Sequence, residues 1–359
     1  LKLASAPPPC PPHRPCAAVA AAMAAPPPAG RRAAVVPSLP LECGEVLKDV
    51  QMSYMCWGKL NERGDNALVL FHAVNCSQDA TEWWGPLVGP AKPIDTDTYF
   101  VFSGNALGGC FGTTGPDEID VRTGKPFKSD FPAITIRDMV QLQAAALQGL
   151  GVTSVACVLG GGLGGMLALE YALGVRAPAP AARTLASLCS SGRHQPWQIG
   201  WGECQRQAIM ADPLWKDGQY ETEAPPTVGL ATARMMAMIT YRTHPAYWTK
   251  FGRSKRHGEQ ASFNVEEYLH HQGDKFISRG FSPRSYVVIT RAMDSHDVSR
   301  GRGQYAEVLR SIKQPALLAS ISSDVLYPVN EQLELLEHMP NAQHHTIESE
   351  QGHDGFLLE

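Results

Sequence analysis

Short apolar runs alternate with stretches of helical periodicity over the middle of the chain. Arg137–Leu150 repeats apolar residues at three- and four-residue spacing, which predicts a helix with one buried face. Gly164–Leu173 is apolar almost all round, which predicts a buried helix. Strands that alternate with helices indicate a parallel, doubly wound sheet. The runs of strand length before, between and after these helices are Ala67–Phe71 (ALVLF), Tyr99–Ser103, Ser154–Leu159 and Thr184–Leu188.

The pattern changes on either side of this region. Before it, Glu42–Gly58 predicts a strand pair with Val46–Leu47 and Val50–Tyr54 as its apolar parts. After Ser191, tryptophans and helix-like stretches such as Val228–Tyr241 predict a helical lid inserted into the sheet domain. We therefore expect core segments at 41–191 and 313–359 and a helical lid insertion at 192–312. In the last segment we expect strands at Ala316–Ser320 and His344–Ile347, with a helix near Glu331–His338.

Residues 1–40 differ in composition from the rest. They contain eleven prolines and four basic residues but no acidic residue. Such a segment cannot bury enough apolar surface to fold, so we expect a disordered tail. Its arginines and lack of acids also resemble an organelle transit peptide. The expected location is the cytoplasm, or an organelle stroma or matrix if this segment is a transit peptide.

The overall composition excludes several classes of protein. Hydrophobic residues make up 44% of the 359 residues and the net charge is −4, so a large core is possible and no basic block points to nucleic acid. Nine cysteines occur without a C-x-x-C pair, so neither a metal site nor a disulfide framework is expected. Val152–Leu169 lacks charges, but its triple glycine argues against a membrane helix and favours a strand, a turn and a buried helix.

The most informative segment is the glycine-rich turn at 160–165, between a predicted strand and a predicted helix. Gly160, Gly162 and Gly165 satisfy the G-x-G-x-x-G spacing of dinucleotide-binding proteins. That motif also needs an acidic residue at the end of the next strand, and Thr184–Leu188 has none. The alternative is the nucleophile elbow, G-x-S-x-G, in which glycines flank a catalytic serine. The flanking glycines are present, but the central position is Gly162.

Several separated motifs resemble homoserine O-acetyltransferases from about Leu41 to Glu359. The family's elbow reads G-G-S-M-G-G-M, and the corresponding residues here are Gly160–Met166. The other matching segments are Asp95–Pro116, Phe131–Val140 (FPAITIRDMV), Arg206–Trp215 (RQAIMADPLW), Gly229–Arg242 (GLATARMMAMITYR), Arg291–Gly303, Ser322–Pro328 (SSDVLYP) and Gly352–Leu358 (GHDGFLL).

This resemblance implies an α/β-hydrolase fold and ping-pong acyl transfer through a serine, an aspartate and a histidine. By position, Asp324 is the orienting carboxylate and His353 the general base. The oxyanion hole would use the backbone N–H groups of Leu163 and Val74. The family has a threonine where Asn75 stands, so side-chain contacts there are expected to change.

The resemblance also implies the substrates and partners. Arg234 and Tyr241 would bind the carboxylate of homoserine or a similar amino acid, and Asp354 its amino group. Acetyl-CoA or another acyl-CoA would be the co-substrate, with no bound cofactor or metal. A homodimer formed through the lid helices is expected. The chain stops at Glu359, where the family's last helix would begin, so we expect that helix to be missing.

Gly162 removes the attacking oxygen, and three hypotheses follow. The chain is an acyltransferase of this family that lacks its serine, or a catalytically dead protein that acts as a binding or regulatory module, or a dinucleotide-binding protein. Ser190 and Ser191, which follow the next strand, are the nearest candidates for a substitute nucleophile, whereas Cys157 lies within a strand.

Overall fold

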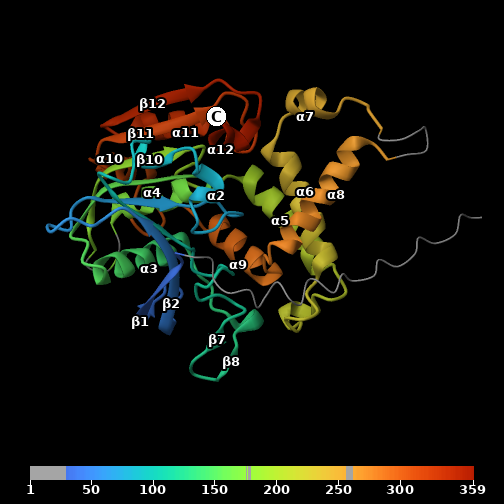
Figure 1. Cartoon of the computed structure of the whole chain (residues 1–359), viewed down its shortest axis with the longest axis horizontal. Helices are drawn as coiled ribbons and strands as arrows, with labels where there is room; N and C mark the ends of the chain where they lie inside the picture. Colours follow the sequence, from blue (N-terminus) through green and yellow to red (C-terminus); the bar gives the residue numbers. More distant parts are fainter. Residues whose placement is uncertain (1–29, 175, 177–178, 256–261) are drawn as a thin grey trace, which may run out of the picture.

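The computed structural model describes residues 30–174, 176, 179–255 and 262–359. Its centre is an eight-stranded sheet in the order β1-β2-β6-β3-β9-β10-β11-β12 (Figure 1). All neighbouring strands from β6 to β12 are parallel, and only β1 and β2 run antiparallel to their neighbours. The strands are β1 Arg32–Pro40, β2 Val46–Trp57, β3 Ala67–Phe71, β6 Phe100–Gly104, β9 Ser154–Gly161, β10 Ala181–Leu188, β11 Ala316–Ile321 and β12 Ala342–Ile347.

Two expectations for the first part of the chain are wrong. Glu42–Gly58 is not a strand pair: Val46–Trp57 is one continuous strand, and its partner is Arg32–Pro40. The expected disordered tail therefore extends too far, because Arg32–Pro40 is the edge strand of the sheet. Burial alternates along this strand, and Leu39 is only 1% exposed. A strand that buries one side chain in two can pair with β2 without a long apolar run. The transit-peptide expectation concerns residues 1–40, of which residues 1–29 lie outside the described residues.

Alternate residues of the central strands supply two hydrophobic cores. In β3, Val69 and Phe71 pack with the helices on one face, whereas Leu68 and Leu70 pack with Trp84 and other residues of the opposite face. The helices of the first face are α3 Ile136–Gly149, α4 Leu163–Leu173, α10 Tyr305–Ser311 and α11 Val329–His338. The second face is covered by α2 Thr81–Trp84, α12 Gly355–Leu358 and the strand pair β4 Val88–Gly89 and β5 Ile94–Asp95.

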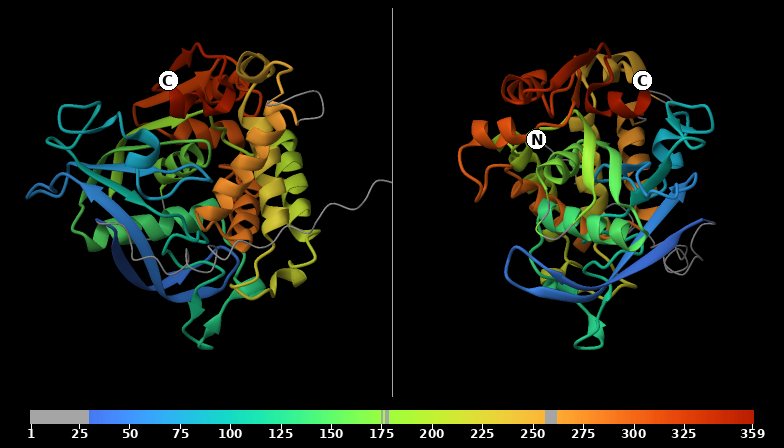
Figure 2. Two further views of the ribbon diagram at one scale, coloured as in Figure 1. Left: turned by 45° about the vertical axis from the view of Figure 1, so that its right-hand side comes forward. Right: turned by 90° about the vertical axis from the view of Figure 1, so that its left-hand side faces the viewer.

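Five helices between β10 and β11 form a separate group beside the sheet (Figures 1 and 2). They are α5 Pro196–Met210, α6 Thr227–Tyr241, α7 His244–Phe251, α8 Asn264–Ser278 and α9 Pro283–Asp294. A small core of their own includes Ile209, Leu230, Phe276 and Tyr286. This is the segment expected as the helical lid, except that α10 packs against α11 of the sheet domain. The remaining short elements are β7 Ile119–Asp120, β8 Lys125–Pro126 and single turns at Lys128–Asp130, Lys216–Gly218 and Gly352–Asp354.

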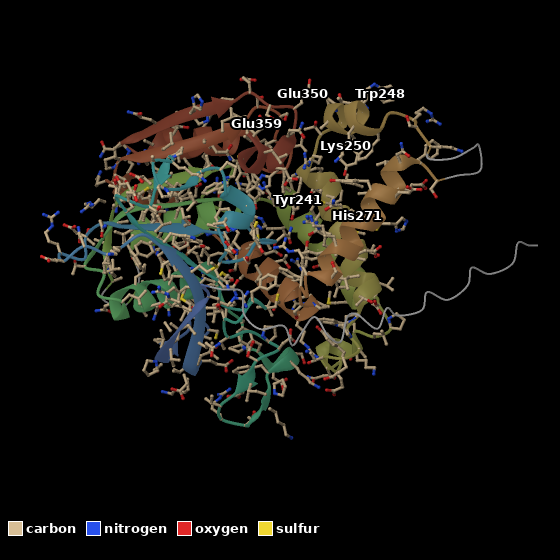
Figure 3. The ribbon with its side chains drawn as sticks, viewed as in Figure 1. Tyr241, Trp248, Lys250, His271, Glu350 and Glu359 are labelled. Carbon is tan, nitrogen blue, oxygen red and sulfur yellow. The ribbon has the colours of Figure 1, made fainter. Side chains whose placement is uncertain are left out.

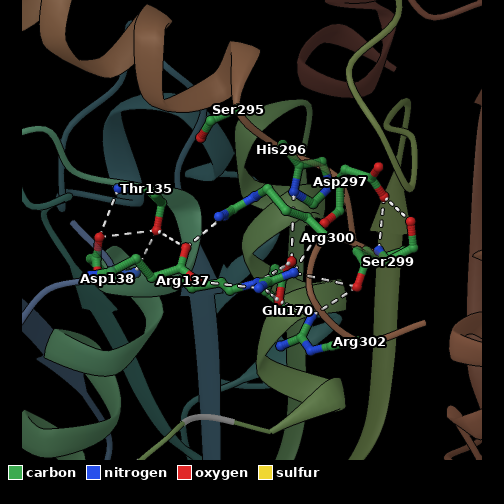
Figure 4. A network of polar contacts seen from close by, with 12 residues as sticks. Thr135, Arg137, Asp138, Glu170, Ser295, His296, Asp297, Ser299, Arg300 and Arg302 are labelled. Atoms are coloured by element: carbon green, nitrogen blue, oxygen red, sulfur yellow. Dashed lines mark hydrogen bonds and ion pairs between the residues drawn. The ribbon is translucent and has the colours of Figure 1, made fainter. Parts of the chain in front are cut away.

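A buried network of charges fixes α4, the helix that begins at the glycine-rich turn (Figure 4). Glu170 of α4 is 2% exposed and accepts hydrogen bonds from Arg137 of α3 and from Arg302. Arg137 also donates to Glu42, at the turn between β1 and β2. Removing one member would leave a buried charge without its partner, which is strongly unfavourable. The network therefore ties α4 to α3, to the edge of the sheet and to the segment after α9.

The described residues contain no helix that is both long enough and apolar enough to cross a membrane. They also contain no group of three or more histidine, cysteine, aspartate or glutamate side chains able to hold a metal ion.

Candidate active site

The glycine-rich turn joins β9 directly to α4. Gly162 has φ 56° and ψ −118°, a backbone conformation that residues with a side chain rarely adopt. Its N–H donates to Leu188 of the neighbouring strand β10, and its carbonyl accepts from Gly165 and Met166 in the first turn of α4. This is the sharp strand-to-helix turn that places a central side chain above the carboxyl ends of the strands.

The other glycines of the turn are required by close packing, but Gly162 is not. A Cβ atom on Gly164 would lie 2.2 Å from the carbonyl oxygen of Phe71, which no side chain can tolerate. A Cβ atom on Gly162 would meet only the ring of His353, with Nε2 at 3.1 Å. The turn therefore has space for a side chain at its central position but not at the flanking glycines. A Cβ atom on each of the other three glycines would also clash: at Gly160 with Phe71, at Gly161 with Phe356, and at Gly165 with Ser190.

We predict that Gly164→Ala destabilises the protein by about 3 kcal/mol, because the new methyl group forces β3 and α4 apart. Gly149→Ala, also at a helical position, is the matched control, since nothing lies within 4 Å of its Cβ position. That control should be neutral or slightly stabilising, because alanine is the better helix former. Urea unfolding of both variants measures the difference, and equal stabilities would contradict the close packing of α4 on β3.

The predicted contact between His353 and Asp324 is confirmed. His353 Nδ1 lies 2.7 Å from Asp324 Oδ2. The second carboxylate oxygen, Oδ1, accepts from the backbone N–H groups of Leu326 and Tyr327 at 2.8 and 2.9 Å. Asp324 follows β11 and His353 follows β12, so both stand beyond the carboxyl ends of their strands. His353 thus turns Nδ1 to the carboxylate and Nε2 to Gly162.

Opposing effects act on the pKa of His353. Burial of the ring lowers this pKa, but the charge and hydrogen bond of Asp324 and the charges of Asp354 and Glu331 raise it, and the net result is above the usual 6.5. The raised pKa means that the surroundings of the ring favour its protonated form more than water does.

We predict that the His353 ring titrates above pH 6.5 and that Asp324→Asn moves its pKa below 6.5. Without the carboxylate, burial becomes the dominant effect. Because the folded-state pKa is raised, the stabilisation by this pair is complete below pH 6.5 and is lost as the pH rises through the folded-state pKa. NMR titration of the imidazole, assigned by comparison with His353→Gln, measures both values. If the pKa of His353 is the same in Asp324→Asn as in the parent, the Asp324 carboxylate is not the cause of the raised pKa.

The proposed oxyanion residues occupy suitable elements. Leu163 is the first residue of α4, so its N–H is one of those without an acceptor inside the helix. Val74 lies in the segment after β3, the strand next to β9. Asn75, at the position where the family resemblance implies a threonine, donates from Nδ2 to the hydroxyl of Tyr241 at 2.8 Å. This hydrogen bond directly links the proposed oxyanion segment to α6.

Arg234, Tyr241 and Asp354 lie close to one another and to His353. The guanidinium of Arg234 stands over the Tyr241 ring, 5.7 Å from its centroid, and that ring lies 6.0 Å from the His353 ring. Burial raises the pKa of Asp354, and Arg242, His353 and Arg234 oppose this effect. Arg234 is therefore directed toward the site. The amino-acid-binding hypothesis requires this direction. Figure 3 shows Tyr241 where the lid meets the sheet domain.

Sequence reasoning missed the partner of Asp354. Arg242 Nε lies 2.9 Å from Asp354 Oδ2, and Arg242 Nη1 also donates to Gln351. Arg242 is the last residue of the matching segment GLATARMMAMITYR, but nothing in the sequence indicates that it pairs with Asp354. This ion pair holds α6 against the histidine segment and offsets part of the charge that Asp354 would present to an ammonium group.

A second chain of polar contacts supports the aspartate segment from the lid. His194 contacts the Tyr327 hydroxyl through Nε2 at 3.0 Å and Asp294 of α9 through Nδ1 at 3.2 Å. Asp294 is also paired with Arg206 of α5 at 2.6 Å. Arg206 and Asp294 belong to two of the family-like segments, yet neither touches His353 directly. Through His194 they are connected to Tyr327, whose ring centroid is 5.1 Å from that of His353.

The candidate substitute nucleophiles lie elsewhere. Ser190 is fully buried against Gly165 of α4, and the Ser191 hydroxyl donates to the carbonyl of Arg193. Cys157 Sγ contacts the carbonyl of Val158 in β9. None of these side chains is within 4 Å of the Cβ position at Gly162. None of these three candidates therefore takes the place of the missing serine beside Gly162.

Comparison with known proteins agrees with this geometry. A family model described as the alpha/beta hydrolase fold matches residues 66–359. The chain is 47% identical over 326 residues to "Homoserine O-acetyltransferase" of Salinibacter ruber, covering 90% of this chain and 92% of that one. It is 49% identical over 319 residues to the protein of the same name from Trichormus variabilis, covering 89% and 87%.

Solved structures show the same fold. Homoserine O-acetyltransferase from Bacillus anthracis superposes with a TM-score of 0.82 at 23% identity, covering 91% of this chain and 93% of that one. Esterase E22 gives 0.81 at 25% identity, covering 91% and 95%. With this fold, the glycine-rich turn between β9 and α4 fits the nucleophile-elbow hypothesis better than the dinucleotide-binding hypothesis. The chain belongs to the homoserine O-acetyltransferase family, whose members have the α/β-hydrolase fold.

Proposed function

We propose that this chain carries the binding and proton-transfer machinery for moving an acyl group from acetyl-CoA to the hydroxyl of homoserine, and that Gly162 impairs the transfer. One observation carries the proposal: the elbow has room at Gly162 alone, and that room faces His353 Nε2 at 3.1 Å. The space at Gly162 and the hydrogen-bonded His353 that faces it support a site built for a side chain at this position.

The roles of the remaining groups follow from their contacts. His353 is the base, and Asp324 holds its Nδ1 so that Nε2 is free to accept a proton. The backbone N–H groups of Leu163 and Val74 are the proposed donors to the oxyanion that forms on the acyl carbonyl. Arg234 and Tyr241 would bind the carboxylate of the amino acid, and Asp354 its ammonium group, with Arg242 holding Asp354 in place.

Without a serine, one route remains open to these groups. His353 Nε2 can take the proton of the acceptor hydroxyl while that oxygen attacks the thioester carbonyl. The bond from carbon to sulfur then breaks, and the CoA sulfur receives the proton from His353. This direct transfer needs both substrates at once and lacks the covalent intermediate, so it should be slower by roughly the six orders of magnitude that a nucleophile contributes.

The main competing proposal is a binding or regulatory module. It is favoured by Gly162 itself, since glycine relaxes the strained elbow while it abolishes the acyl-enzyme. The two proposals make opposite predictions for one change, because only the first requires that a serine at position 162 restores CoA release from acetyl-CoA. That assay is the test of the proposed function.

We also propose that the protein forms a homodimer through the lid. Large apolar side chains are exposed on α6 and α7: Val228 is 74%, Ile239 52% and Trp248 61% exposed. Their position on the lid helices is consistent with a face that a second copy covers.

A further inference from the structure

Asn75 stands in the segment that follows β3, directly after the proposed oxyanion donor Val74. Its side chain crosses to the end of α6, where Nδ2 donates to the Tyr241 hydroxyl at 2.8 Å. Its own carbonyl oxygen Oδ1 is buried and has no hydrogen-bond partner within the described ranges of the chain. Because buried amide oxygens are normally hydrogen-bonded, this free acceptor marks Asn75 as facing a site rather than a closed core.

The hydrogen bond from Asn75 determines whether the Tyr241 hydroxyl is a donor or an acceptor toward a ligand. An amide nitrogen can only donate, so the tyrosine oxygen is the acceptor and its proton remains free for another partner. Burial raises the pKa of Tyr241 to about 12, so the hydroxyl keeps this proton throughout the neutral range. Arg234 lies over the same ring, which places a cation beside the free O–H. A neutral donor beside a guanidinium suits a carboxylate ligand.

A threonine could not impose this direction. Its hydroxyl both donates and accepts, so it can leave the tyrosine proton engaged between the two side chains. The exchange of threonine for asparagine in this chain therefore affects how the acceptor substrate is held.

We infer that Asn75 is a positioning residue that commits this site to an acceptor bearing a carboxylate, by fixing Tyr241 as a hydrogen-bond donor to it. The inference rests on the proposed function, since it concerns the acceptor half of the same site. It also links the two halves, because one segment supplies the oxyanion donor Val74 and the orientation of Tyr241.

The test is ligand binding to the protein as it stands, where Gly162 prevents rapid turnover. Isothermal titration calorimetry with L-homoserine is compared with L-homoserinol, which lacks the carboxylate. We expect Asn75→Ala and Tyr241→Phe each to weaken homoserine binding about tenfold, the effect of one hydrogen bond to a charged group. The double variant should be no weaker than Tyr241→Phe alone, because Asn75 acts only through that hydroxyl. Neither change should alter the binding of homoserinol.

Asn341→Ala is the matched control, since Asn341 also donates one side-chain hydrogen bond, to Lys313, at an exposed site. Its affinity for homoserine should equal that of the parent. The positioning role would be wrong if Asn75→Ala lowered the affinity for homoserine and for homoserinol equally. It would also be wrong if the affinity losses of the two single variants multiplied in the double variant. Either result would leave the proposed function standing. If the parent binds acetyl-CoA but no homoserine, the acceptor assignment fails and this inference fails with it.

Discussion

Gly162→Ser should raise the rate of acyl transfer from acetyl-CoA to homoserine by about six orders of magnitude, the contribution of a nucleophile in comparable triads. The backbone at position 162 already has the conformation of an elbow residue, and its carbonyl already accepts the first bonds of α4. The new Cβ atom would lie 3.1 Å from His353 Nε2, so the ring must shift by a few tenths of an ångström.

The gain has a cost in stability. A residue with a side chain at φ 56° is strained, so we expect the serine to lower the free energy of unfolding by about 1–3 kcal/mol. Gly162→Ala is the matched control, since it introduces the same Cβ atom and the same strain but no hydroxyl. Both variants should lose similar stability in urea unfolding, and only the serine variant should release CoA.

Two measurements identify the cause of any activity. With acetyl-CoA alone, Gly162→Ser should show one burst of CoA release per active site and an acyl adduct on position 162 in intact-protein mass spectrometry. Addition of homoserine should then give continuous release. A folded serine variant without a burst and without an adduct would reject the acyltransferase proposal and favour the binding module.

The sheet and its flanking helices could be predicted because each buried strand is a single apolar run. Ala67–Phe71 forms β3 with the predicted bounds, and its five residues are all buried. The first strand could not be found in this way. Arg32–Pro40 is an edge strand with few buried residues, and its proline-rich surroundings have the composition of a disordered segment. Its position depends on pairing with β2, which no local pattern reveals.

The candidate site was predicted to different degrees for different residues. The contact of Asp324 with His353 could be anticipated because two strand ends meet at one edge of a parallel sheet. The contacts of Asn75 with Tyr241 and of Arg242 with Asp354 could not, because they join the core to the lid. How an inserted group of helices docks is decided by packing across the interface between lid and core, so sequence spacing gives no information about it.

Asp324→Asn in the Gly162→Ser protein should lower acyl transfer by about four orders of magnitude, the size of this effect in Ser-His-Asp sites. The geometry of the carboxylate explains why an isosteric change would be so severe. Oδ1 accepts from the N–H groups of Leu326 and Tyr327, so an asparagine must keep its carbonyl oxygen there. Its amide nitrogen then replaces Oδ2 and presents a donor to His353 Nδ1, 2.7 Å away in the parent. Because two donors cannot face each other, the ring must move its proton from Nδ1 to Nε2.

That tautomer cannot act as a base, since Nε2 now carries a hydrogen and faces the serine as a donor. The expected result is loss of both the burst and the continuous release of CoA, with little change in stability, because the backbone contacts of Oδ1 are kept. Asp354→Asn is the matched control: the neighbouring carboxylate is paired with Arg242 and lies at the proposed acceptor end. It should retain the burst with acetyl-CoA and lose mainly the step that depends on homoserine. If Asp324→Asn keeps the rate of acyl transfer within about tenfold of its parent, then Asp324 does not orient His353. If both variants lose the same half-reaction, then the separation of the site into a proton-transfer end and an acceptor end is wrong.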